Sequence, residues 1–345
     1  MRGRPLQAAC VAIIFACFLS LRTSGHAAAL PVTAVESVGM TVGDMDRAAH
    51  FYTDVLSFQK ESDTEVAGRE YELLEGVFGA RMRIVRLRLG DESLELTEYL
   101  APKGRMIPPD MRANDRMFQH IAIIVSDMDR AFARLRQFHV VQASTGPQTL
   151  PSWNRGAAGI SAYYFRDPDG HFLEVLHFPA GKGLEKWHRT DRLFLGIDHT
   201  AIVVGDTDHG LRLYRDLLGL NVVGESENYD VEQEHLNNVF GARLRITTLR
   251  AATGPGIELL EYLTPRDGRP VPLDLKANDI GHWQTTLATT SPGHALDLLR
   301  ERLFTLVSPK AVSVPDASLG IGTALVIRDP DGHALQLAQK RAPSR

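Results

Sequence analysis

A long internal repeat constrains the fold of this chain more than any other feature of its sequence. The segment Val77–Ile84 (VFGARMRI) recurs 162 residues later as Val239–Ile246 (VFGARLRI). Asp167–His171 (DPDGH) recurs as Asp329–His333 at the same spacing. A duplication explains both matches. The 345 residues therefore divide into two similar halves, with a boundary near 179–191, where Pro, Gly, Lys and Arg interrupt the apolar pattern.

Each half contains a shorter repeat of its own. Asp44–Ala48 (DMDRA) reappears as Asp127–Ala131, 83 residues further on, and both segments follow an apolar run. Asp206 and Ser291 occupy the same junction in the second half. Asp and Ser at such junctions cap the helix that follows. Because strand signals come after each helix, we predict four modules of one strand, one helix and roughly three further strands.

Four βαβββ modules of this kind resemble the vicinal oxygen chelate (VOC) superfamily, which includes glyoxalase I, methylmalonyl-CoA epimerase, extradiol dioxygenases and bleomycin-resistance proteins. The resemblance covers about residues 34–340. It implies an α+β fold with cupped mixed sheets. We therefore expect one VOC domain at residues 34–178, a linker at 179–193 and a second VOC domain at 194–340.

The first 29 residues have the pattern of a secretory signal peptide. Arg2 and Arg4 precede the apolar run Ala8–Leu21, and Ala27–Ala29 supplies small residues for cleavage. The run is shorter than the roughly 20 apolar residues that span a membrane. We therefore expect residues 1–29 to be removed, leaving a periplasmic or secreted protein without a membrane span.

Composition narrows the partners and the metal chemistry. The 38 basic and 42 acidic residues are interspersed, so we expect no nucleic-acid partner. Cys10 and Cys17 are the only cysteines, and both precede residue 30. The remainder can form neither a disulfide nor a thiolate metal site. We expect a monomer or homodimer that binds a small-molecule substrate.

The resemblance also implies candidate metal ligands, because VOC proteins usually take one ligand from the first strand and one from the last strand of each contributing module. The first-strand matches are Ser37, His120, His199 and His282. The last-strand matches are Glu95, Glu174, Glu258 and Gln336. Serine is a poor ligand, whereas a glutamine oxygen can still coordinate a hard or borderline metal. All of these residues except Ser37 are candidate ligands of a divalent ion (Zn, Ni, Fe or Mn).

Strand periodicity supports the carboxylates independently. Glu258, Leu260 and Tyr262 share one strand face, and Glu95 shares a face with Tyr99. We predict that these faces line concave cavities, although an edge strand with solvated glutamates would show the same pattern. The pairing of modules stays open. Pairing within each half would give two sites, one from Ser37, Glu95, His120 and Glu174 and the other from His199, Glu258, His282 and Gln336. Pairing of modules two and three, as in some glyoxalases, would instead unite His120, Glu174, His199 and Glu258.

Arginines on the predicted strands suggest an anionic substrate. Arg83, Arg243 and Arg245 alternate with apolar residues, so they could face the cavity and bind a carboxylate or phosphate, together with Tyr99 and Tyr262. A salt-bridged sheet is the alternative. His171 and His333, beside the DPDG turns, are expected to be solvated.

Three functions fit this site. A glyoxalase-like lyase or isomerase would chelate adjacent substrate oxygens on the metal, with Glu258 or Glu174 moving the proton. An extradiol-type dioxygenase could use His199, His282 and Glu258, although residues 160–175 lack the usual signature spacing. A small-molecule binding protein without enzymatic activity is the third possibility.

Overall fold

The computed structural model describes residues 30–342, so the predicted signal peptide lies outside the described residues. Module one comprises β1 (Ala34–Thr41), α1 (Met45–His50), β2 (Gln59–Ala67), α2 (Arg69–Glu75), β3 (Arg81–Leu89) and β4 (Glu92–Ala101). Module two comprises β5 (Phe118–Val125), α3 (Met128–Gln137), β6 (Val141–Gln142), β7 (Gln148–Thr149), β8 (Ser161–Arg166) and β9 (Phe172–His177). Module three comprises β10 (Phe194–Val204), α4 (Thr207–Leu211), β11 (Asn221–Asn228), α5 (Asp230–Asn237), β12 (Arg243–Arg250) and β13 (Gly256–Thr264). Module four comprises β14 (Trp283–Ala288), α6 (Pro292–Glu301), β15 (Thr305–Leu306), β16 (Val312–Ser313), β17 (Ile321–Arg328) and β18 (Ala334–Lys340).

Shorter helical segments complete the modules. Helices α1 and α4 continue into π-helical turns, η1 (Phe51–Val55) and η3 (Arg212–Leu217). The 3-10 turns η2 (Glu185–His188) and η4 (Ala317–Leu319) lie between strands. Within residues 30–342, no helix combines the length and apolarity needed to cross a membrane.

The predicted helix caps are confirmed. In every module the side chain of the junction residue accepts a hydrogen bond from the backbone N–H three positions later. The four capping residues are Asp44, Asp127, Asp206 and Ser291. These bonds satisfy N–H groups that lack a partner within the helix.

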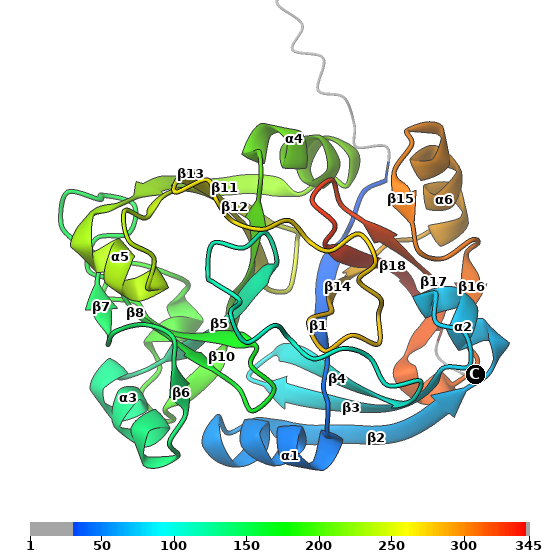
Figure 1. Cartoon of the computed structure of the whole chain (residues 1–345), viewed down its shortest axis with the longest axis horizontal. Coiled ribbons are helices and arrows are strands. Elements are labelled where there is room, and N and C mark those ends of the chain that lie inside the picture. The colour runs from blue at the N-terminus through cyan, green and yellow to red at the C-terminus, as the bar shows by residue number, and fades with distance from the viewer. Residues whose placement is uncertain (1–29, 343–345) are drawn as a thin grey trace, which may run out of the picture.

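The modules pair across the two sequence halves. Modules two and three form one sheet, with β5 antiparallel to β10 at its centre, and modules one and four form the other, with β1 antiparallel to β14. We call these sheets the inner cup and the outer cup, after the position of their modules in the sequence. In Figure 1 most green elements of the inner cup lie on the left, the orange-red elements of the outer cup lie on the right, and the blue helix α1 runs along the bottom. The second pairing considered from the sequence is therefore the one that forms.

Helices α1, α3, α4 and α6 cover one face of the sheets, and the opposite faces, against which α2 and α5 pack, enclose a cavity in each cup. Leu259 on β13 packs in the same large core cluster as Leu211 of α4, whereas Leu260 belongs to a second cluster on the opposite face. This alternation follows from the period-two geometry of a strand. Glu258 therefore faces away from α4 and into the cavity, as its position in the sequence predicts.

The histidines beside the DPDG turns are buried, so the prediction that they are solvated was wrong. His171 pairs through Nδ1 with Asp167 (2.9 Å), and its Nε2 contacts the carbonyl of Ile280 at 2.7 Å. His333 Nε2 contacts the carbonyl of Val203 at 3.0 Å. His333 thus reaches from the outer cup to β10 of the inner cup, and His171 reaches the loop that leads into β14 of the outer cup.

Candidate metal centre

Four predicted ligands meet on the concave face of the inner cup. They are His120 on β5, Glu174 on β9, His199 on β10 and Glu258 on β13. Strand register brings them together: Ala122 lies beside both His199 and Glu174, and Ala201 lies beside both His120 and Glu258. Small alanine side chains at these two positions leave room for the larger ones around them.

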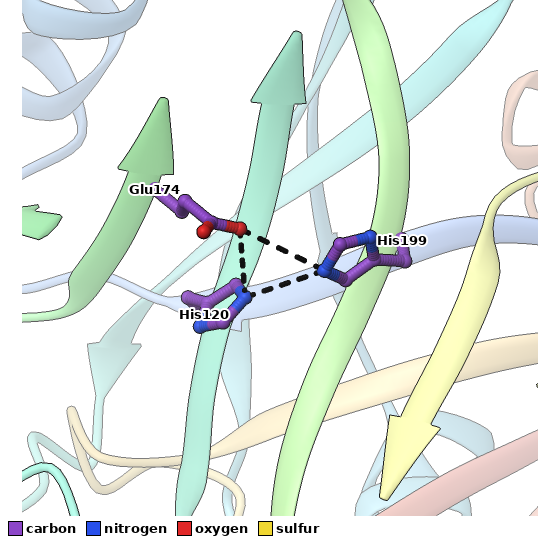
Figure 2. A group of neighbouring side chains, drawn as sticks. All are labelled: His120, Glu174 and His199. Carbon is purple, nitrogen blue, oxygen red and sulfur yellow. Dashed lines mark hydrogen bonds and ion pairs between the residues drawn. The ribbon is translucent and has the colours of Figure 1, made fainter. Parts of the chain in front are cut away.

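Three of the four side chains form a tight triad. Figure 2 shows the two imidazoles and the Glu174 carboxylate pointing toward one another. Glu174 Oε2 lies 3.1 Å from His120 Nε2 and 3.7 Å from His199 Nε2, and the two Nε2 atoms are 3.5 Å apart. Within residues 30–342, no other three His, Cys, Asp or Glu side chains bring ligand atoms within 4.8 Å of one another.

Glu258 lies beside the triad, nearer the cavity. Its Oε2 is 3.4 Å from His199 Nε2, and its Oε1 accepts a hydrogen bond of 2.7 Å from the Thr248 hydroxyl. The Glu258 side chain is 17% exposed, against 4% for Glu174. Glu174 is thus enclosed by the histidines, whereas Glu258 can reach a molecule in the cavity.

Hydrogen bonds behind the two imidazoles leave their Nε2 atoms available as ligands. His199 Nδ1 contacts Asp198 Oδ2 at 3.0 Å, and His120 Nδ1 contacts the side-chain oxygen of Gln119. An Nδ1–H that donates to such an acceptor leaves the Nε2 lone pair free. Two lone pairs then face the Glu174 carboxylate, an arrangement that favours a bound cation. The nitrogen and oxygen donors fit a borderline divalent ion such as Zn²⁺, Ni²⁺ or Fe²⁺.

The charges around His199 also favour a bound cation. Burial disfavours the charged form of His199, but the surrounding carboxylates, led by Glu258, outweigh burial and raise its pKa to about 9. The pocket therefore attracts positive charge, and a proton and a metal ion would compete for the same nitrogen.

The cavity above the ligands has a volume of about 360 Å³. Its polar lining includes Ser226, Asn228 and Gln233, and apolar side chains such as Leu150, Ile160 and Phe178 form the remaining walls. Such a mixture of apolar walls with a few convergent polar groups is typical of small-molecule sites.

The outer cup lacks an equivalent ligand set. In the other three modules the candidate residue precedes the helix cap by seven positions, as His199 precedes Asp206. In module four this spacing from Ser291 gives Gln284, not His282. The strand register gives the same result. Gln284 on β14 pairs with Gly39 on β1, just as His120 on β5 pairs with Ala201 on β10.

The remaining outer-cup candidates are occupied by protein partners. Glu95 pairs with Arg86 at 3.1 Å, and Gln336 accepts a hydrogen bond of 3.1 Å from Thr286. Arg86 occupies the position that Thr248 holds in the inner cup, so a guanidinium neutralises the carboxylate there. The outer-cup cavity measures only about 40 Å³. His282, Glu95 and Gln336 all line this small cavity, but Glu95 and Gln336 are bonded to protein partners there. The dioxygenase set of His199, His282 and Glu258 does not form, because His282 lies in the other cup.

The predicted arginine subsite does not form either. Leu244 and Ile246 face the cavity, whereas Arg243 and Arg245 point the opposite way toward Glu227 and Asp208. Arg83 likewise pairs with Asp63 and Asp46. Leu244 shares a core cluster with Leu236 of α5, which packs on the cavity face, so the apolar residues take that face and the arginines take the opposite, more exposed face.

The predicted tyrosines are both buried on the cavity side of their sheets. Tyr262 packs in the same hydrophobic cluster as Leu260, on the cavity face of the inner cup, and Tyr99 lines the small cavity of the outer cup. Sequence reasoning missed Asp198, Gln119, Thr248 and Arg250, which contact the ligands or line the cavity. The Asp-His and Gln-His dipeptides were the available signal for the first two.

Glu75 gives a test of the outer-cup electrostatics. Burial and the nearby Glu95 raise the pKa of Glu75 to about 7. Because the folded state holds this proton more tightly than the unfolded state, stability is lost as pH rises above the unfolded pKa, and the loss levels off above the folded pKa. Glu75→Gln should therefore stabilise the protein more at pH 8 than at pH 5, by about 2–3 kcal/mol at 1.36 kcal/mol per pKa unit. Urea unfolding at both values measures this, and a pH-independent difference would contradict it.

Comparison with known proteins identifies the family. The sequence profile of the Glyoxalase/Bleomycin resistance protein/Dioxygenase superfamily matches residues 34–175 and 196–337. The chain therefore belongs to this superfamily. A 2-epi-5-epi-valiolone epimerase from an Actinomyces species is 35% identical over 166 residues, which cover 44% of this chain and 84% of that protein.

Solved structures agree on the fold. Glyoxalase I from Zea mays superposes with a TM-score of 0.54 at 16% identity, covering 89% of this chain and 92% of that chain. A candidate dioxygenase from Bacillus subtilis superposes with a TM-score of 0.54 at 15% identity, covering 91% and 87%. The fold expected from the resemblance, α+β with tandem VOC sequence repeats and curled mixed sheets, is therefore confirmed.

Proposed function

We propose that this chain is a metal-dependent isomerase, of the epimerase type, that moves a proton at a carbon next to a substrate carbonyl. The observation that carries the proposal is the convergence of His120, Glu174 and His199, with Glu258 beside them, at the base of an open cavity. The epimerase relative supports the same reaction class.

The two carboxylates have different roles in this proposal. Glu174 is enclosed between the imidazoles, so it holds the metal together with His120 and His199. When bound, the divalent ion supplies Lewis-acid polarisation of the substrate oxygens. Glu258 keeps one oxygen on Thr248 and directs the other toward the site, so it removes the proton and returns it.

The cavity favours a neutral, hydroxylated substrate over an anionic one. Of the described residues that line it, Arg250 alone is Arg or Lys, and its guanidinium donates to Asp198 at 2.7 Å. The polar groups left for the substrate are amides and hydroxyls, such as those of Gln233 and Ser226. These can donate to and accept from substrate hydroxyls.

Deuterium exchange tests this function. The purified chain, loaded with Zn²⁺, Ni²⁺, Mn²⁺ or Fe²⁺ in turn, is incubated in D₂O with 2-epi-5-epi-valiolone or 2-hydroxycyclohexanone. We expect deuterium at the carbon next to the carbonyl with at least one metal, detected by NMR. Absence of exchange with every metal would contradict the proposal, and binding without exchange would indicate a sequestering protein.

One observation favours a second candidate, a ring-cleaving dioxygenase. His120, His199 and Glu174 together make a 2-His-1-carboxylate set, which suits non-haem iron(II). The extra carboxylate of Glu258 favours the isomerase, because proton transfer needs a base and ring cleavage by iron does not require this one. Oxygen consumption by the Fe²⁺-loaded chain with catechol would decide for the dioxygenase.

We also propose that the protein is exported, on the basis of residues 1–29 alone. Fractionation of the host cell, with detection of a shortened chain outside the cytoplasm, tests this. A chain that keeps its N-terminus in the cytoplasm would contradict it.

A further inference from the structure

The segment between the two sequence halves lines the cavity beside the metal centre. Phe178, Gly183 and Leu184 line the cavity, and Trp187 in η2 is buried against β10. A Cβ at Gly196 would lie only 2.8 Å from the Trp187 ring, so the glycine makes space for the indole. The segment predicted to be a linker is therefore packed into the site.

Trp187 and Arg250 hold one carboxylate from two sides. Asp198 Oδ1 accepts a hydrogen bond of 2.8 Å from the Trp187 indole and one of 2.7 Å from the Arg250 guanidinium. Asp198 Oδ2 remains for His199 Nδ1, at 3.0 Å. Asp198 itself is 5% exposed, so protein groups rather than water fix its orientation.

We propose that Asp198, held in place by Trp187 and Arg250, is the positioning residue of the metal centre and fixes His199 with its Nε2 toward Glu174. This inference rests on the proposed function, because it needs a metal on that nitrogen. A carboxylate behind a ligating histidine fixes the ring orientation and strengthens the nitrogen as a donor. His120 has only the neutral amide of Gln119 in that role, so the two histidines are supported unequally.

The outer cup provides a comparison within the same chain. Glu36 and Arg88 occupy the positions that Asp198 and Arg250 hold in the inner cup, next to Ser37 in place of His199. There Glu36 pairs with Lys340 at 2.9 Å, and Arg88 pairs with Glu61. The outer cup therefore has an acidic residue and an arginine at the matching positions, but each of them pairs with a different residue. In the inner cup, where the next residue is His199, the acid and the arginine pair with each other.

Cobalt binding to the full chain tests the proposal without using activity. The Co²⁺ dissociation constant is measured by competition with a chelating dye, and the visible Co²⁺ spectrum reports ligand geometry. We expect Asp198→Ala to weaken binding about 10–100-fold and to change the spectrum. Trp187→Phe, which keeps a ring but loses the N–H donor, should weaken binding about fivefold. The matched control, Glu36→Ala, should leave both readouts unchanged.

The outcomes separate this inference from the proposed function. Wild-type chain that binds Co²⁺, with both variants within twofold of it and an unchanged spectrum, would overturn the positioning role alone. Wild-type chain that binds no Co²⁺ would overturn both. If Asp198→Ala does not fold, judged by circular dichroism, Trp187→Phe decides.

Discussion

Glu258→Gln is expected to lower the rate of substrate deuterium exchange by about 10²–10⁴-fold, the range typical for loss of a general base. The amide keeps the size of the side chain and can still accept from Thr248, which donates to Oε1 at 2.7 Å. It cannot take up a proton from carbon. Because His120, His199 and Glu174 remain, metal binding should persist.

The control for this variant is Glu95→Gln, the matching glutamate of the outer cup. Glu95 pairs with Arg86 and faces a cavity of about 40 Å³, too small for a substrate. We expect its exchange rate to equal that of the wild type. An exchange rate within threefold of wild type for Glu258→Gln would remove Glu258 from the role of base.

His199→Ala is expected to weaken metal binding about 100-fold. The binding free energy of Zn²⁺ at structural protein sites is about 10–16 kcal/mol, or roughly 3 kcal/mol for each of four ligands. Loss of one ligand therefore corresponds to ~100-fold in the dissociation constant. His199 Nε2 lies within 3.7 Å of both Glu174 and Glu258, so its loss also leaves two carboxylates without their shared partner. Metal analysis after dialysis against a weak chelator measures the effect.

Ser37→Ala provides the matched control in the outer cup and should leave metal content unchanged. Undiminished metal in His199→Ala, with the variant folded as judged by circular dichroism, would show that the ion binds elsewhere.

Local sequence patterns predicted the modules and the strand face of Glu258 because both depend on short-range geometry. The caps at Asp127 and Asp206 follow from hydrogen bonds within one helical turn. The side to which Glu258 points follows from strand alternation. His120, Glu174 and His199 then came from family resemblance applied at these fixed strand positions.

The features that sequence could not decide are long-range. The pairing of β5 with β10 and of β1 with β14 depends on which modules dock, and repeats in one chain are equivalent in local pattern. Arg243 and Arg245 were placed on the wrong face because helix coverage at that strand end is a tertiary property. His282 was mistaken for the ligand position because it is a histidine that precedes an apolar run, whereas counting seven residues back from the cap at Ser291 gives Gln284.

Anomalous diffraction from crystals of the full chain grown with Zn²⁺ would locate the bound ion itself. We expect one strong peak per chain at the zinc edge, about 2.0–2.2 Å from Nε2 of His120 and His199 and from a Glu174 oxygen. A peak beside Glu95 and Gln336 instead, or density in the inner cup that contacts neither histidine, would contradict it.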